Sequence, residues 1–211
     1  MKRKVIFVAG IITVLGALAS PGARAQEKNE IGLVIGGTAT PGRSFSSGTT
    51  GTASFDSSLA LGAEYDRRVF DRERVAVYGG IDFVASPLDV KLSNPPSDVI
   101  GQYAYVFLTP HVRVKFHPHG SLSPWLLVGG GYARFLEKRP AAVPSFVPGT
   151  NTGTAVFGGG IDTRTVLHVF KIPIGFRVEV RDFYSGSPNY NRAVDGNQNN
   201  VVFTGGLLIK F

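Results

Sequence analysis

The chain has 211 residues, no cysteine, 27 glycines and a hydrophobic fraction of 43 %. This composition excludes disulfide-stapled small domains, thiolate metal sites and disordered chains of low hydrophobicity. The formal net charge is +7, but the first 25 residues hold four of the 22 basic residues and none of the 15 acidic ones, so the remaining 186 residues carry +3. So small a charge gives no electrostatic basis for nucleic-acid binding, and we expect no nucleic acid as a partner.

The N-terminus has the three parts of a secretory signal peptide. Lys2-Arg3-Lys4 precedes an uncharged run over residues 5–20, and Ala23-Arg24-Ala25 is a small-x-small cleavage signature. The apolar run is short for a membrane-spanning helix. We therefore predict that residues 1–25 are removed, that the mature chain begins at Gln26, and that residues 26–211 form one domain.

Eight segments of the mature chain alternate between apolar and polar residues with the period of a β-strand, and no stretch keeps a helical apolar stripe. The predicted strands are Glu30–Gly37, Ser58–Asp66, Arg74–Ala85, Tyr103–Phe116, Pro124–Leu136, Gly153–Thr163, Phe170–Tyr184 and Asn200–Phe211. Most of them reach the ~9–11 residues that a tilted membrane strand requires. The pattern predicts an all-β chain.

The segments between these strands alternate in length. Their boundaries are Thr38–Ser57, Arg67–Glu73, Ser86–Gln102, His117–Ser123, Glu137–Thr152, Arg164–Val169 and Ser185–Asn199, and the odd ones are long while the even ones are short. Bacterial outer-membrane barrels have short periplasmic turns and longer extracellular loops. We therefore predict an eight-stranded, antiparallel, up-and-down transmembrane barrel with both ends of the chain in the periplasm.

One parity of each strand is almost free of charge and is predicted to face lipid. It comprises Ile31, Leu33, Ile35, Leu59, Leu61, Tyr65, Val75, Val77, Ile81, Phe83, Val106, Leu108, Val112, Val114, Phe116, Trp125, Leu127, Phe135, Phe157, Ile161, Ile172, Ile174, Phe176, Val178, Val180, Val201, Phe203, Leu207, Ile209 and Phe211, with Asp182 as the one charge. The strand at Pro124–Leu136 is ambiguous, because Trp125-Leu126-Leu127-Val128 is apolar on both faces. The aromatic residues near strand ends, Trp125 and Phe135 among them, are predicted to form two interfacial girdles.

The opposite parity carries the charges and is predicted to face the lumen. The acids are Glu30, Glu64, Asp66, Asp82, Asp162 and Glu179, and the bases are Arg74, Arg113, Lys115, Arg134, Lys171, Arg177, Arg181 and Lys210. His111 is one more inward polar residue. Eight strands leave only enough space for side chains, so we expect these charges to pair across the lumen and the barrel to have no water-filled pore.

Two prolines bear on the predicted number of strands. Pro110 and Pro173 fall inside predicted strands of a barrel that has no free edge, so each is expected to mark a bulge or kink. If either strand ended at its proline, the count of eight would be wrong.

A soluble secreted barrel that binds a small apolar ligand is an alternative, and it would be apolar inside and polar outside.

Three stretches resemble a known family. Pro124–Tyr132 is similar to a Pro-aromatic-apolar-Gly strand, Ala155–Asp162 follows a long loop, and Val201–Phe211 ends the chain in Phe after alternating apolar residues. Together they resemble small outer-membrane β-barrels of the outer-membrane-protein-A, outer-membrane-protein-X and opacity-protein kind, including the porin-like members. The resemblance implies location in a bacterial outer membrane among its lipids. It also implies recognition by the barrel-assembly machinery through the last strand, with Phe203, Gly205, Leu207, Ile209 and Phe211 as the signal.

Motifs for catalysis and cofactor binding are scarce. No G-x-S-x-G, H-E-x-x-H, Walker or dinucleotide motif is present, and His117 with His119 would supply only two metal ligands. His119 and Ser121 form an H-x-S pair similar to that of lipid A deacylases, but the sequence assigns it no orienting acid. We expect no enzyme, no cofactor and no metal, with a lipid-modifying barrel enzyme as the alternative.

The four long loops are where specific binding is expected, because a rigid barrel displays its loops outside the cell. Their Pro- and aromatic-containing parts include Phe45, Asn94–Ser97, Pro144–Pro148 and Ser187–Asn191. They name no ligand. The function predicted from the sequence is therefore a structural or surface-interaction role in the outer membrane.

Overall fold

The computed structural model describes residues 28–41, 43–46, 50–55, 58–93, 99–139, 150–169, 172–186 and 197–211. The predicted signal peptide, with Ala23, Ala25 and Gln26, lies outside these residues. So do Lys171 and the loop segments 94–97, 144–148 and 187–191. Among the described residues there is no helix long and apolar enough to span a bilayer.

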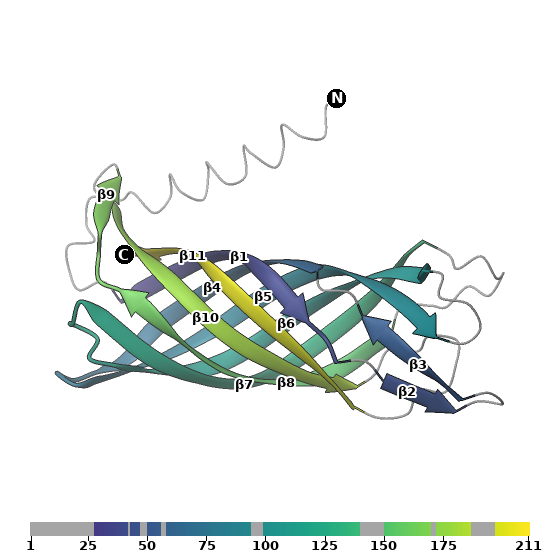
Figure 1. Ribbon diagram of the computed structural model, residues 1–211. Coiled ribbons are helices and arrows are strands. Elements are labelled where there is room, and N and C mark those ends of the chain that lie inside the picture. The colour runs from purple at the N-terminus through teal and green to yellow at the C-terminus, as the bar shows by residue number, and fades with distance from the viewer. Residues whose placement is uncertain are drawn as a thin grey trace.

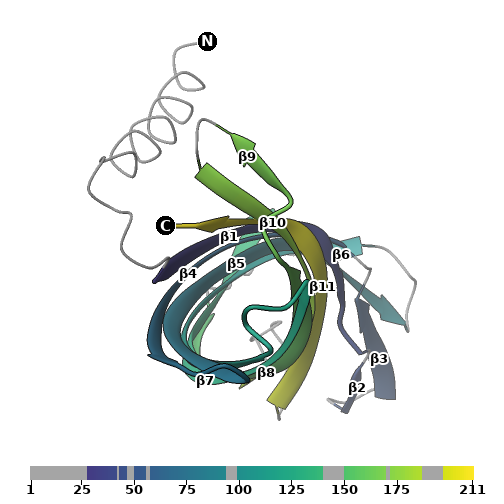
Figure 2. The same cartoon turned by 90° about the vertical axis from the view of Figure 1, so that its left-hand side faces the viewer.

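Eight antiparallel strands close into a barrel (Figure 1). They are β1 (Asn29–Ala39), β4 (Ser58–Asp71), β5 (Val75–Ser93), β6 (Val99–Phe116), β7 (Leu122–Arg139), β8 (Thr150–Thr163), β10 (Ile172–Gly186) and β11 (Asn197–Lys210). Each pairs with its neighbour along the barrel, and β11 pairs with β1 from Glu30↔Lys210 to Ala39↔Val201, which closes the ring (Figure 2). The predicted all-β, eight-stranded up-and-down barrel is confirmed.

The two ends of the barrel differ as predicted. The turns 72–74 and 117–121, the β8–β10 connection and the C-terminus lie at one end, where the backbones of Asn29 and Phe211 exchange two hydrogen bonds of 2.9 Å. We call this the short-turn end. The loop end lies opposite (Figure 1).

Short additional strands lie at both ends, in segments that we predicted to be plain connections. At the loop end, β2 (Arg43–Ser46) and β3 (Thr50–Phe55) form a hairpin, and β3 pairs with β5 through Thr52↔Ser93 to Phe55↔Val90. The pairing of β5 with β6 continues to Lys91↔Val99, so most of the predicted second long loop is strand. At the short-turn end, β9 (Leu167–Val169) pairs with the start of β10.

The exterior carries the predicted apolar parity on seven of the eight strands. The exposed members are Leu33, Ile35, Leu59, Leu61, Tyr65, Ile81, Phe83, Leu108, Val112, Phe116, Phe157, Ile161, Phe176, Val178, Val180, Phe203 and Leu207. Ile209 is an exception, because it is only 8 % exposed. Large apolar side chains exposed all round a closed barrel form a surface for hydrocarbon, not for water, and this contradicts the soluble, ligand-carrying alternative.

The prediction of which face of β7 points into the lumen was wrong, because the inward and outward residues are exchanged. Trp125, Leu127 and Phe135 are buried in the lumen, whereas Leu126 and Arg134 are exposed on the exterior. Trp125 and Phe135 therefore do not belong to the girdles. A four-residue run that is apolar on both faces cannot define its own orientation from sequence.

The inward set needs two further corrections. Arg74 is exposed in the β4–β5 turn, and Lys210 is half-buried at the short-turn end. The acids Glu30, Glu64, Asp66, Asp82, Asp162 and Glu179 and the bases Arg113, Lys115, Arg177 and Arg181 are all buried in the lumen.

Neither proline introduces the predicted bulge. Pro110 pairs with Ile81 without a register shift in β5–β6, and the β6–β7 ladder merely skips Thr109 and Pro110 between Leu108↔Tyr132 and His111↔Gly129. The gap falls where proline has no N–H to donate. Pro173 pairs with His168 of β9, before β10 joins β8 at Arg177↔Asp162. It therefore lies outside the closed part of the barrel.

Candidate functional site

The lumen of the barrel holds a cluster of buried ion pairs centred on Glu64 of β4. Arg113 Nη2 donates to its Oε2 at 2.5 Å and Arg181 Nη2 donates to the same oxygen at 2.6 Å, while Arg177 Nη1 donates to Oε1. These arginines come from β6 and β10, so Glu64 links strands that are not neighbours in the sheet. A buried carboxylate requires such compensation, because an unpaired ion is costly away from water.

Trp125 forms one wall of this cluster. The guanidinium carbons of Arg113 and Arg177 lie 4.4 and 5.2 Å from the centre of its ring, within the range of cation–π attraction. Its indole Nε1 donates to Asp162 Oδ1 at 2.9 Å. Trp125 is thus a member of the polar cluster, and sequence reasoning missed this because it assigned the residue to lipid.

A second group of pairs lies towards the short-turn end. Arg177 binds Asp162 with two hydrogen bonds, from Nε at 2.7 Å and from Nη2 at 2.8 Å. Lys115 Nζ lies 2.7 Å from Asp162 Oδ2 and donates to both oxygens of Glu30 at 2.8 Å. Lys115 also lies 4.7 Å from the centre of the Tyr78 ring. Each cation here contacts more than one acceptor, so the group is a network and not a set of separate pairs.

His111 of β6 lies between two carboxylates. Its Nε2 is 2.8 Å from Asp66 Oδ1, and its Nδ1 is 3.2 Å from Asp82 Oδ2. Asp66 also accepts from Arg113 Nη1 at 2.6 Å. The approach of His111 to Asp82 lacks hydrogen-bond alignment. Asp82 forms an ion pair with Arg181, whose Nη1 lies 2.8 Å from its Oδ2.

Glu179 completes the network on the β10–β11 side. It accepts from Arg181 Nη2 at 2.6 Å and from the Thr204 hydroxyl at 2.7 Å. The nine charged residues named from the sequence are therefore brought together: Glu64, Asp66, Asp82, Arg113, Lys115, Asp162, Arg177, Glu179 and Arg181. Glu30 and His111 join them.

Glycines on neighbouring strands make the space for these side chains. Glu64 pairs across the sheet with Gly32, Asp66 with Gly80, and Trp125 with Gly160. A Cβ at Gly160 would lie 2.6 Å from Trp125 Cζ2, and one at Gly32 would lie 2.5 Å from Glu64 Cγ. Gly160 therefore leaves room for the indole of Trp125 inside the lumen. The sequence contains these pairs of a large inward residue and a glycine, but they can be recognised only when the register of the strands is known.

An apolar plug fills the lumen between the ion network and the loop end. Phe107 stacks on Phe183 with ring centroids 4.4 Å apart, and it meets Phe135 edge-on at 6.3 Å. The plug comprises Ala60, Val84, Tyr105, Phe107, Leu127, Ala133, Phe135, Val156, Phe183 and Val202, in contact with Trp125. The prediction of a polar interior is therefore correct for only part of the lumen.

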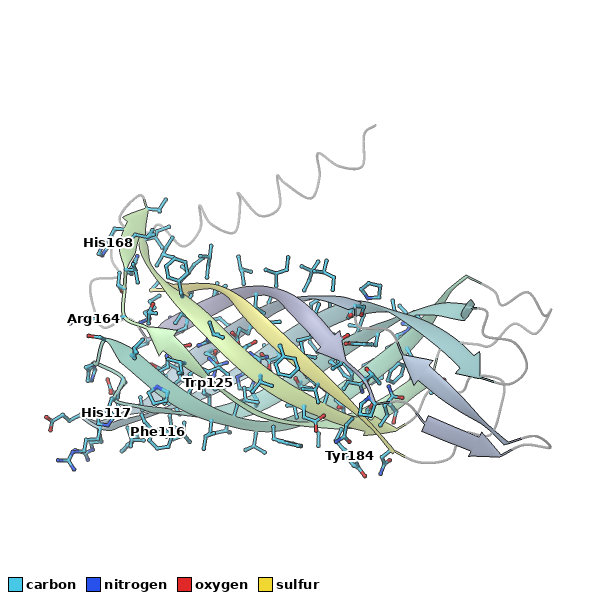
Figure 3. All side chains as sticks on the ribbon, viewed as in Figure 1. Phe116, His117, Trp125, Arg164, His168 and Tyr184 are labelled. Atoms are coloured by element: carbon cyan, nitrogen blue, oxygen red, sulfur yellow. The ribbon has the colours of Figure 1, made fainter. Side chains whose placement is uncertain are left out.

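The short turn between β6 and β7 holds the residues of the enzyme alternative. His119 is 60 % exposed, and its Nε2 lies 3.3 Å from Asp71 Oδ1. Asp71 is thus the acid that the sequence could not supply. Ser121 is exposed, and its backbone oxygen accepts from Arg164 N at 2.9 Å. Of the His–Ser and His–acid contacts that a triad needs, only the His–acid contact is found among these described residues. His117 and His168 are exposed turn and β9 residues (Figure 3).

No group of three or more His, Cys, Asp or Glu within the described part of the chain is arranged to hold a metal ion. The residues of the proposed assembly signal lie on β11, where Phe203 and Leu207 are exposed on the exterior, and Phe211 follows the strand. Gly205 pairs with Ile35 and Val178, and Ile209 with Ile31 and Ile174.

Solved structures with this architecture are known. The crystal structure of Neisserial surface protein A is 11 % identical, superposes with a TM-score of 0.56 and covers 88 % of this chain and 98 % of its own. The outer-membrane protein OprG from Pseudomonas aeruginosa is 16 % identical with a TM-score of 0.57, over 87 % of this chain and 96 % of its own. These likenesses concern the fold.

The chain has the fold of a small outer-membrane β-barrel. Its apolar exterior, its short turns at one end and its eight strands are those of a bilayer-spanning barrel of this class, and the predicted location in a bacterial outer membrane is confirmed. No protein-family model matches the chain, and no curated protein matches it.

Proposed function

We propose that this protein is a sealed, non-enzymatic barrel with a structural or surface-interaction role, and that any specific binding is made at its loop end. The observation that supports this proposal is the filled lumen. Its largest fully buried side chains are Trp125, Arg113, Arg177, Arg181, Tyr105, Phe107, Lys115, Phe135, Phe183, Leu208 and Gln198. Among the described residues, buried side chains are packed from the ion network to the aromatic plug, as expected for an eight-stranded barrel that conducts no solute.

The ion network stabilises the barrel instead of serving as a reaction centre. Its arginines are bound to several carboxylates at once, and the side chains of Glu64, Arg113 and Arg177 are 1 % exposed or less. A catalytic or binding group must reach a ligand, whereas these groups are occupied by one another. Cross-lumen pairs connect β4, β6, β8 and β10, which supports a role in holding the strands together.

The loop end supports the interaction role. The β2–β3 hairpin extends the sheet beyond the barrel through β5, so part of the first long connection is attached to the rigid wall (Figure 1). Binding residues are frequently carried by loops on a rigid scaffold. A barrel with such an extension presents backbone at a fixed position outside the membrane.

The lipid-modifying alternative is supported by the His119–Asp71 contact, but its location counts against it. The pair lies at the short-turn end, which faces the periplasm in this class of barrel, whereas lipid A occupies the outer leaflet at the other end. If His119→Ala and Ser121→Ala leave the lipid A composition of expressing cells unchanged, the non-enzymatic proposal stands. A change that both variants abolish would replace it.

The test of the sealed barrel is reconstitution of the full chain in planar bilayers beside a porin of known conductance. We expect no steps above the bilayer baseline. Regular conductance steps would contradict the proposal.

The display role is tested by an epitope inserted between β2 and β3, within residues 47–49, with a matched insertion at Gly120 in the short turn. Antibody is expected to bind intact cells that carry the first insertion and to bind cells with the second only after permeabilisation. The reverse pattern would contradict the proposal.

A further inference from the structure

The short-turn end carries an unusual excess of basic side chains. Among the described residues, seven basic side chains lie at this end, Lys28, Arg67, Arg68, Arg72, Arg74, Arg164 and Lys210, together with the acidic side chains of Asp71 and Glu73 and the C-terminal carboxylate of Phe211. We call the seven basic residues the basic collar. Arg68 pairs with Asp71 at 2.9 Å. The basic side chains of the collar outnumber these acidic groups, and the ion network of the lumen does not include them.

A cavity of about 390 Å³ opens at the same end, between the β6–β7 turn and the β8–β10 connection. Its lining residues are Pro118, His119, Arg164, Thr165, His168 and Lys210. Four of the six are basic or can become so, and none is acidic. The chemistry of this lining fits a phosphate group, which accepts several charge-assisted hydrogen bonds.

Backbone hydrogen bonds fix the walls of the cavity. Arg164 N donates to Ser121 O at 2.9 Å, which ties the two connections together, and Val166 N donates to Ile174 O at 2.8 Å. In the β6–β7 turn, Gly120 N donates to His117 O at 2.8 Å, and His117 adopts a left-handed backbone conformation with φ of 48°. The basic side chains therefore project from an ordered frame.

Apolar side chains stand beside this cavity. β9 lies outside the ring of barrel strands when the molecule is viewed onto the short-turn end (Figure 2), and Figure 3 shows Arg164 and His168 at this end. Val166, Leu167 and Val169 around β9 are 59 %, 39 % and 43 % exposed. Phe116 and Leu122 carry the apolar exterior to the same level. Apolar groups next to cations suit the boundary between hydrocarbon and headgroups.

We propose that this cavity binds the phosphate of an anionic phospholipid headgroup in the periplasmic leaflet, with Arg164 and His168 as its main donors. Leu167 and Val169 then contact the acyl chains, and the basic collar attracts further anionic lipid around the rim. The proposal depends on the orientation of the barrel and not on the display role of its loops. The short-turn end then binds anionic phospholipid, separately from any binding at the loop end.

The test is a titration of the full chain, refolded in nonionic detergent, with dihexanoyl phosphatidylglycerol below its micelle concentration. Binding is followed by the NMR shifts of labelled histidine and arginine side chains. We expect saturable binding that is about 25-fold weaker in the Arg164→Gln/His168→Gln variant, since each of the two basic groups near anionic lipid contributes on the order of a factor of five. The matched control is Arg134→Gln, an exposed arginine at the loop end, which should bind as the wild type does.

Two further measurements separate the lipid from a bare anion. Inorganic phosphate is expected to compete weakly, and Leu167→Ser/Val169→Ser is expected to weaken lipid binding without affecting phosphate. Equal binding of free phosphate and lipid would overturn the assignment to lipid. Unchanged lipid binding in the Arg164→Gln/His168→Gln variant, or no saturable shift in the wild type, would overturn the site. Heat-modifiable migration on a gel verifies that each variant is folded.

Discussion

Trp125 Nε1 donates a hydrogen bond of 2.9 Å to Asp162 Oδ1, across the β7–β8 pair and inside the lumen. The bond places the chain's one tryptophan on the polar side of a strand whose exterior neighbours are Leu126 and Val128. Asp162 also accepts two hydrogen bonds from Arg177. The indole is therefore held where several members of the ion network meet.

Tryptophan fluorescence tests this placement. In vesicles of brominated phospholipid, emission from the wild-type barrel should be nearly unquenched, because Trp125 is only 2 % exposed and lies behind the wall. The control variant Trp125→Phe/Leu126→Trp moves the indole to a position that is 61 % exposed to lipid, so its emission should be strongly quenched. Strong quenching of the wild type would mean that β7 has the orientation first predicted from the sequence.

Replacement of Glu64 by Gln should destabilise the barrel by about 3–5 kcal/mol, because it leaves three arginines without their common carboxylate. The free energy of unfolding from lipid vesicles in urea measures this. Glu73→Gln, an exposed carboxylate in the β4–β5 turn, serves as control and should change the free energy by less than about 0.5 kcal/mol. Equal small effects at both positions would mean that the network contributes little.

Two adjacent glycines provide a matched pair. A Cβ at Gly80 would lie 2.8 Å from His111 Nε2 and 2.5 Å from Tyr65 O, whereas one at Gly79 has nothing within 4 Å. Gly80→Ala should therefore cost about 1–3 kcal/mol of overpacking, and Gly79→Ala should be close to neutral. The same urea titration compares them, and a greater loss at Gly79 would contradict the proposed role of glycine in making room.

A charge on the exterior should be costly where the wall meets hydrocarbon. Val178→Arg places a guanidinium at a position that is 66 % exposed, and it should destabilise the barrel by ~2–4 kcal/mol if the residue lies near the bilayer midplane. Ser121→Arg, in the exposed short turn, should have no comparable effect. A Val178→Arg barrel as stable as the wild type would show that this face is in water.

Much of the fold could be predicted because lipid imposes a strict alternation. Residues such as Arg177, Glu179 and Arg181 on one parity and Phe176, Val178 and Val180 on the other define their strand without ambiguity. The same rule fails at Trp125-Leu126-Leu127-Val128, where both parities are apolar and glycines lie across the pair from both faces, Gly160 opposite Trp125 and Gly159 opposite Leu126. Inside the lumen a side chain has only to fit the space between the strands, so both an aromatic plug and an ion network can be accommodated there.

The charged members of the site were predictable from the sequence, whereas Trp125 and the contacts between the members were not. Sequence parity placed Glu64 and Arg181 on one face, yet their contact joins β4 to β10 across the lumen and depends on barrel closure and stagger. The β2–β3 hairpin was missed because its strands are short and rich in Ser, Thr and Gly, which do not alternate. The β9 hairpin and its cavity were missed for a similar reason, since three residues are too few to show a period.

The most direct test of the account is fractionation of cells expressing the full-length chain, followed by gel electrophoresis of the outer-membrane fraction with and without boiling. A barrel closed by the β1–β11 pairing and held by the buried ion network should be recovered in that fraction and should migrate differently when unboiled. A protein found in the soluble periplasmic fraction, with the same migration before and after boiling, would contradict the membrane-spanning barrel on which every other prediction depends.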